Sequence, residues 1–158
     1  MPTVIINDDH FINKGFSIST DKILLNFEMI YHYLDQESYW AKGIPKDRLQ
    51  RAIDNSMCFG VYHKKDQIGF ARVITDKATF AYLADVFILN SYRKQGLSKW
   101  LVQTIVEHSD LQGLRRLSLA TSDAHGLYAQ FGFTPITSPE NWMQIFKPYP
   151  ITEEAKEK

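Results

Sequence analysis

The segment from Tyr82 to Leu101 joins an apolar strand, a short basic turn and an amphipathic helix without interruption. The first turn of a helix presents unpartnered backbone N–H groups and a partial positive charge of about half a unit, and such an end binds phosphate. Gly96 would let the backbone approach a phosphate closely. The spacing matches neither GxxxxGK(S/T) nor GxGxxG. The segment therefore predicts a phosphate site of another class, or else a plain strand-to-helix connection with solvated basic residues.

The elements around this turn follow from the spacing of the apolar residues. Alternating or continuous apolar runs predict strands over 15–19, 57–62, 68–75, 79–89, near 117–119, and over 133–136 and 143–146. Apolar residues at helical spacing predict helices over 23–34, from about 45 to 53, and over 97–106 and 127–131. This order predicts a mixed α/β (α+β) domain in which about four helices flank a central sheet of six or seven strands.

The composition is that of a globular protein: of 158 residues, 44% are apolar and 23% are charged. We expect one domain over 1–150 and a charged tail over 151–158. Eighteen basic and eighteen acidic side chains cancel, which gives no electrostatic reason to expect nucleic acid or a membrane as partner. The N-terminus lacks the features of a signal peptide, and the longest apolar run, 78–89, is too short to span a bilayer. We therefore expect a cytoplasmic protein.

Disulfide and metal chemistry are both disfavoured. The single cysteine, Cys58, excludes an intramolecular disulfide and argues against a cysteine-based metal site. The five histidines show no clustered ligand spacing. We therefore expect no metal.

Two short motifs carry a family resemblance. The RKQGLS run at 93–98 resembles the Q/R-x-x-G-x-G/A signature of the GNAT superfamily of acyl-CoA N-acyltransferases, with Ser98 in place of the usual Gly or Ala. The HGLYAQFGF run at 125–133 is similar to the family's late signature, in which a tyrosine is followed by a glycine–aromatic pair. The two motifs occur in the family's order, with a strand between them.

This resemblance implies a sheet that splays apart after its fourth strand and a site for acetyl-CoA in the split. The pantetheine arm would pair with the end of the fourth strand, and the pyrophosphate would lie on the turn that follows. Thr121 stands where many members carry an asparagine that bonds the pantetheine, so that contact is in doubt; Ser122 and Asp123 either compensate or cap the next helix. The implied coenzyme-binding residues are Phe87, Ile88, Leu89, Arg93, Lys94, Gln95, Gly96, Leu97, Ser98, Lys99 and Thr121.

The same resemblance gives two candidate catalytic residues. Tyr128 occupies the family's tyrosine position, and a phenol with a pKa near 10 can give a proton to a departing thiolate. Its alternative role is core packing. An acidic residue inside an apolar strand is costly unless it is paired or exposed in a cleft, which makes Asp85 the candidate base or amine-binding carboxylate. A structural aspartate, or a water chain that removes the amine proton, remains the alternative.

The acceptor pocket should be lined by the early helices and the strands that face them. Aromatic side chains can hold an ammonium group by cation–π contact, although packing is the alternative role for each residue. The candidate acceptor-binding residues are Tyr33, Tyr39, Trp40 and Arg72.

We therefore expect an N-acetyltransferase that moves an acetyl group from acetyl-CoA to a primary amine by direct attack. The balanced charge favours a small-molecule acceptor over a peptide or protein amine. The other alternative is a non-catalytic acyl-CoA sensor, against which the presence of Tyr128 argues. The acceptor is not identified, and a homodimer is compatible with the sequence.

Overall fold

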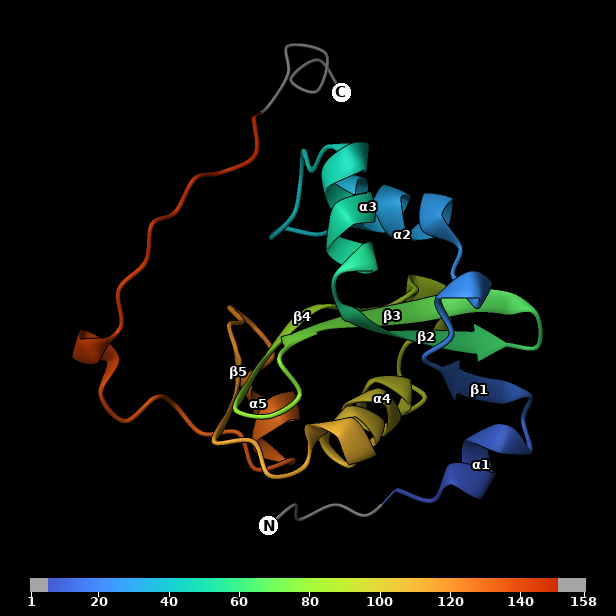
Figure 1. The fold of residues 1–158 in the computed structure, drawn as a ribbon. Coiled ribbons are helices and arrows are strands. Elements are labelled where there is room, and N and C mark those ends of the chain that lie inside the picture. Colours follow the sequence, from blue (N-terminus) through green and yellow to red (C-terminus); the bar gives the residue numbers. More distant parts are fainter. Residues whose placement is uncertain (1–5, 151–158) are drawn as a thin grey trace.

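A computed structural model describes residues 6–150, so the predicted charged tail over 151–158 lies outside the described residues (Figure 1). The strands of this part are β1 (Phe16–Ser19), β2 (Met57–His63), β3 (Asp66–Thr75), β4 (Phe80–Ile88) and β5 (Arg116–Leu119). Its α-helices are α1 (Asp8–Ile12), α2 (Phe27–His32), α3 (Lys46–Asp54), α4 (Leu97–Val106) and α5 (His125–Ala129). A π-helical turn, Tyr33–Glu37, continues α2, and 3-10 turns cover Lys22–Leu24, Asn90–Tyr92, Ser109–Leu111 and Pro139–Asn141.

The five strands form one sheet in the order β1-β2-β3-β4-β5. Strands β1, β2, β3 and β4 pair in that order as antiparallel neighbours, and β5 is parallel to β4. Antiparallel strands can be joined by tight hairpins, whereas a parallel neighbour needs a crossover connection. Helix α4 lies in that crossover, so the chain leaves β4 through the basic turn and returns at β5.

The sheet is covered on both faces, which gives two apolar cores (Figure 1). Helices α4 and α5 lie against one face, where Trp100 and Leu101 are buried. Helices α2 and α3 cover the other face, where Ile30 and Leu49 are buried. Apolar residues on both sides of a strand, as in β3 and β4, are typical of a sheet that is buried on both faces. Strand β4, which leads into the basic turn, is therefore packed on both of its faces.

The predicted helix over 23–34 is divided in two. Lys22–Leu24 forms a 3-10 turn, the chain extends at Leu25, and α2 begins only after Asn26. The Asn26 side chain accepts a hydrogen bond from the N–H of Met29, which is the contact of an N-cap. The sequence prediction joined the two segments into one helix because it used only the spacing of apolar residues, which does not register the helix cap at Asn26.

The predicted count of six or seven strands is not confirmed, because the described residues contain five. The two segments expected to complete the sheet, 133–136 and 143–146, are described and form no strand. Their apolar residues satisfy a strand pattern, but a strand also needs a neighbour with which to pair. Met143 and Ile145 are instead 95% and 92% exposed.

Strand β4 carries a bulge and then loses its neighbour on one side. Arg72 pairs with Ala84 and Phe70 with Phe87, so that two residues of β4 oppose one residue of β3. Asp85 lies in this bulge with a φ of 57°. On the other side, pairing with β5 ends at Leu83, so β4 continues past the last residue that its neighbour pairs with.

Among residues 6–150, no helix is both long and apolar enough to cross a bilayer.

Candidate functional site

The first part of the site is the turn between β4 and α4, which we call the coenzyme corner (residues 93–99). Gly96 has a φ of 85° and precedes the first residue of α4. The first helical hydrogen bond runs from the N–H of Trp100 to the carbonyl of Gly96. The N–H groups of the three residues in between, 97–99, therefore have no acceptor within the helix and face outward from its end. Helix α4 therefore begins at the predicted residue, directly after a glycine of positive φ.

Arg93 is engaged within the protein. Its guanidinium donates to the carbonyl oxygen of Ile88 over 3.0 Å and to the hydroxyl of Tyr33 over 2.7 Å. Burial raises the pKa of Tyr33, although the positive charge of Arg93 opposes this shift. The two side chains therefore link the turn to the π-helical segment, and Tyr33 contacts the coenzyme corner through Arg93. Lys94 and Lys99, like Arg93, are exposed.

The end of β4 offers its backbone, while its side chains belong to the cores. Phe87 and Ile88 are both 3% exposed, and the Phe87 ring stacks on Tyr33 at 3.9 Å between centroids. On one side, this stretch pairs with β3, including the N–H of Leu89 donated to the carbonyl of Ile68. On the other side, β5 does not reach past Leu83. An open backbone edge thus leads along β4 towards the coenzyme corner.

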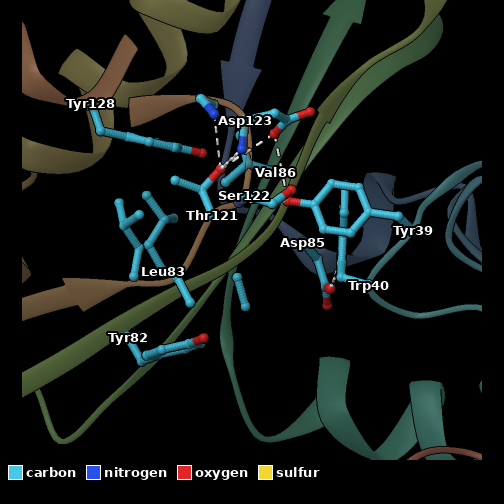
Figure 2. Close-up of a pocket in the computed structure, with 14 residues that line it drawn as sticks. Tyr39, Trp40, Tyr82, Leu83, Asp85, Val86, Thr121, Ser122, Asp123 and Tyr128 are labelled. Atoms are coloured by element: carbon cyan, nitrogen blue, oxygen red, sulfur yellow. Dashed lines mark hydrogen bonds between the residues drawn. The ribbon is translucent and has the colours of Figure 1, made fainter. Parts of the chain in front are cut away.

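The second part of the site is a cavity of about 390 Å³ beside the opening between β4 and β5, which we call the acceptor cavity (Figure 2). Its walls come from the middle of β4, the end of β5 with the loop into α5, and the loop that follows the π-helical turn. It is lined by Tyr39, Trp40, Tyr82, Leu83, Ala84, Asp85, Val86, Leu119, Ala120, Thr121, Ser122, Asp123, Ala124 and Tyr128.

Asp85, which lines the acceptor cavity, is hydrogen-bonded to two side chains. Its two carboxylate oxygens each accept one hydrogen bond at 2.9 Å, from Nε1 of Trp40 and from Nε of Arg72. Arg72 also donates to the hydroxyl of Ser56 over 3.0 Å. Asp85 is 9% exposed, and the ion pair explains how a carboxylate is tolerated in this strand. Three residues singled out separately in the sequence thus form one network.

Tyr128 lines the cavity from α5, and its ring packs edge-on against Phe133. The residue is 9% exposed, and burial raises the pKa of its phenol to about 12. Within residues 6–150 its hydroxyl has no hydrogen-bond partner, and it points towards the turn at Thr121 in Figure 2. A protonated hydroxyl is therefore available at the cavity wall.

The Thr121 hydroxyl accepts the N–H of Ala124 over 3.1 Å in the turn before α5. Helix α5 itself has Ala124 at its N-cap and no side-chain capping hydrogen bond, so the cap considered for Ser122 or Asp123 does not form. Ser122 donates its N–H to the hydroxyl of Tyr39 over 3.1 Å, and hydrogen bonding with Ser122 lowers the pKa of Tyr39. This contact and the place of Tyr82 in the wall were missed, because no local pattern signals a contact across 83 residues.

The part of the chain that the structure describes contains no group of three or more His, Cys, Asp or Glu side chains able to hold a metal ion.

Comparison with known proteins places this geometry in a family. Residues 27–133 match the model of the acetyltransferase (GNAT) family. A protein of Gibberella zeae classed as an acetyltransferase is 34% identical over 148 residues, covering 80% of this chain and 82% of the relative. A crystal structure from Xanthomonas campestris, assigned to the same family, is 53% identical with a TM-score of 0.82 and covers 84% of this chain and 94% of that one.

The fold also matches more distant structures. A GNAT family acetyltransferase from Elizabethkingia anophelis with acetyl-CoA bound has a TM-score of 0.59 at 11% identity, over 84% of this chain and 89% of that one. At this identity the likeness concerns the fold alone. Because the family model covers more than half of the sequence, and its two motifs lie at the coenzyme corner and on α5, the chain belongs to the GNAT family of acetyltransferases.

Proposed function

We propose that this protein transfers an acetyl group from acetyl-CoA to the primary amine of a small molecule, with residues 1–150 acting as one catalytic domain in the cytoplasm. The observation that carries the proposal is the open edge of β4 beyond Leu83, which runs from the acceptor cavity towards the free N–H groups at the start of α4. A long ligand with a diphosphate at one end and a reactive group at the other fits this layout.

The coenzyme corner would hold the diphosphate. The N–H groups of residues 97–99 face outward from a helix of ten residues, and Gly96 keeps the preceding backbone free of a side chain. Lys94 and Lys99 supply exposed positive charge beside them. The backbone of β4 from Ala84 onward would accept hydrogen bonds from the pantetheine amides, since no strand of the described chain occupies that edge. Acetyl-CoA supplies the acyl group as an activated thioester.

The acceptor cavity would hold the amine. Its volume of about 390 Å³ is that of a small-molecule site. The carboxylate of Asp85 and the rings of Tyr39 and Trp40 offer a primary ammonium group both charge and aromatic faces. Because both oxygens of Asp85 already accept hydrogen bonds, we assign this carboxylate to orienting the amine, while water removes its proton.

Tyr128 would complete the reaction. The neutral amine nitrogen forms a bond to the thioester carbon, the carbon–sulfur bond breaks, and the thiolate takes a proton from the phenol. With its pKa raised to about 12, the phenol is protonated at neutral pH. It then recovers a proton from solvent, so the net proton released is that of the amine. Such a correctly placed acid contributes about 10²–10⁴ in rate.

Two measurements test the proposal. Calorimetry should show acetyl-CoA binding in the micromolar range, roughly 8 kcal/mol. S-acetylpantetheine, which lacks the diphosphate, should bind much more weakly if the coenzyme corner holds that group. A panel of primary amines assayed for release of free coenzyme A thiol should then identify the acceptor. Absence of acetyl-CoA binding would refute the proposal, whereas binding without turnover on any amine would favour the sensor alternative.

A further inference from the structure

Two carboxylates of the acceptor cavity stand on different walls and are connected through two consecutive aromatic residues (Figure 2). Asp85 belongs to β4 and accepts a hydrogen bond from Nε1 of Trp40 over 2.9 Å. Asp123 belongs to the turn before α5, and the hydroxyl of Tyr39 donates to it over 3.5 Å. The rings of Tyr39 and Trp40 meet edge to face, with 5.0 Å between their centroids. A pair of half-exposed aromatic rings therefore separates the two negative groups.

The two carboxylates differ in how their charge is balanced. Arg72 pairs with Asp85 at 2.9 Å, and its guanidinium is not among the groups that line the cavity. Asp123 is exposed and has no ion-pair partner among residues 6–150. Its side-chain contacts with the hydroxyls of Tyr39 and Thr121 are long, at 3.5 and 3.4 Å. Asp123 therefore carries an uncompensated negative charge at the cavity.

The other residues of the cavity wall do not balance this charge. Within the described part of the chain, none of the residues that line the cavity is a lysine, an arginine or a histidine. The hydroxyl of Tyr128, in a residue only 9% exposed and without a partner within residues 6–150, points towards the same turn (Figure 2). Two polar groups on this wall, a carboxylate and a phenol, thus face the cavity and are free to bind a ligand.

We propose that the acceptor is a diamine, a molecule with two ammonium groups joined by an apolar chain, and that Asp123 selects it by holding the ammonium group that does not react. This inference rests on the proposed acetyl transfer, in which Asp85 orients the reacting amine. The rings of Tyr39 and Trp40 would pack along the apolar chain and offer cation–π contact to the charged nitrogen. The cavity of about 390 Å³ has room for such a molecule.

The charge at Asp123 also defines which amines are poor acceptors. A carboxylate or phosphate on the acceptor would stand beside Asp123 with no cation in the wall to pair with it, and unpaired like charges are a common means of rejecting a wrong ligand. Amino acids and amino-sugar phosphates should therefore react slowly.

The reaction adds one acetyl group and leaves the second nitrogen charged. The neutral nitrogen at Asp85 loses its proton to water as it bonds to the thioester carbon, and the departing thiolate takes a proton from Tyr128. The products are free coenzyme A thiol and a monoacetyl diamine. This product has no second amine to place at Asp85 while its ammonium group stays at Asp123, so the reaction should stop at one acetyl group.

Matched acceptors test the substrate class. Cadaverine, n-pentylamine and δ-aminovalerate share a five-carbon chain and differ only in the group at the second end. With acetyl-CoA, thiol release should give a kcat/KM about tenfold higher for cadaverine than for n-pentylamine, after correction for its two equivalent amines, because a charged hydrogen bond contributes at least such a factor. The value for δ-aminovalerate should be lower than both. Putrescine, n-butylamine and γ-aminobutyrate repeat the comparison with a shorter chain.

The outcomes separate this inference from the proposed function. Equal values for diamine and monoamine at both chain lengths, or a preference for the amino acids, would overturn the diamine acceptor while leaving acetyl transfer intact. No thiol release with any amine would instead refute acetyl transfer itself, and the diamine acceptor with it.

Variants of Asp123 test the residue. Asp123→Asn should abolish the tenfold preference by lowering kcat/KM for cadaverine and leaving that for n-pentylamine unchanged, and Asp123→Lys should favour δ-aminovalerate. Asp110→Asn is the matched control, because Asp110 is an exposed aspartate that pairs with Lys77 at 3.5 Å and does not line the cavity, so the preference should persist. Calorimetry should give the same acetyl-CoA affinity for all three variants. If Asp123→Asn lowers both values equally, or if the Asp123 variants lose acetyl-CoA affinity, Asp123 supports the turn without contacting the acceptor and the inference is wrong.

Discussion

The coenzyme corner and the acceptor cavity differ in the chemical groups that form them and in how far apart these groups lie in the sequence. The corner is a continuous stretch of seven residues whose working groups are backbone amides, fixed by the φ of Gly96 and the start of α4. The cavity collects side chains from the loop after α2, from β4 and from the turn before α5, and one of its contacts joins residues 83 positions apart. Changes in the corner should therefore act through backbone shape and affect coenzyme affinity, whereas changes in the cavity should affect rate or the network that holds it.

The largest expected effect is that of Tyr128→Phe, which removes one hydroxyl from the cavity. The proposal predicts that kcat falls by about 10²–10⁴ while acetyl-CoA affinity stays the same, because the phenol donates only to the departing thiolate. Thiol release and calorimetry measure the two quantities separately. An unchanged kcat would show that Tyr128 is not the acid, and a parallel loss of coenzyme affinity would remove the distinction between corner and cavity.

The pH dependence gives a second measure of the same residue. Burial raises the Tyr128 pKa to about 12, so the phenol is protonated, and able to donate, at every pH below that value. The rate should rise with pH as the amine loses its proton, and it should show no decline from Tyr128 ionisation up to pH 10. If the rate of the wild-type protein falls between pH 8 and 10 and that of Tyr128→Phe does not, Tyr128 loses its proton in this range. That result would contradict a pKa raised by burial.

The next effect concerns the network around Asp85. Asp85→Asn keeps the shape but removes the charge that Arg72 faces, and breaking a buried pair from one side costs about 3–5 kcal/mol in the free energy of unfolding. Urea unfolding measures this loss. The double variant Asp85→Asn/Arg72→Met should regain part of it, because no unpaired guanidinium remains. Equal stability of wild type and Asp85→Asn would mean that the pair does not support the cavity.

The smallest effect is expected in the corner. Gly96→Val places a branched side chain at a φ of 85°, which costs about 1–2 kcal/mol, and should weaken acetyl-CoA binding roughly tenfold as the turn relaxes. A Cβ at this position would meet only Phe11 at 3.5 Å, an ordinary contact, so the cost is conformational. Gly96→Asn is the control, since asparagine tolerates this backbone region, and its affinity should stay near wild type. If the wild type, Gly96→Val and Gly96→Asn bind acetyl-CoA with equal affinity, the conformation of this turn does not contribute to coenzyme binding.

Local features of the molecule could be predicted from the sequence. The spacing of apolar residues placed β2, β3 and α4 within a residue or two, and the late motif placed Tyr128 on a short helix. These features depend on residues that are neighbours in the chain. Helix α1 was missed, because its five residues contain only two apolar side chains and are specified mainly by the Asn7 cap.

Features that depend on distant contacts could not be predicted in the same way. The partners of Asp85 come from 45 and 13 residues earlier in the chain, and nothing in the local sequence selects them. The hydrogen bond from Arg93 to the hydroxyl of Tyr33 joins residues 60 positions apart, and no local pattern signals it. The last two strands were predicted from composition, although pairing depends on an edge that composition does not reveal.

The bulge at Asp85 has a consequence for how this strand can change in length. Before it, odd-numbered residues such as Ala81 and Leu83 face the core beneath α4, whereas after it the even-numbered Val86 and Ile88 do so and Phe87 faces the opposite core. Removing any one residue here would exchange the two faces of everything downstream, up to the entry into the basic turn. Relatives that share this corner should therefore tolerate a different amino acid at position 85 more readily than a missing one.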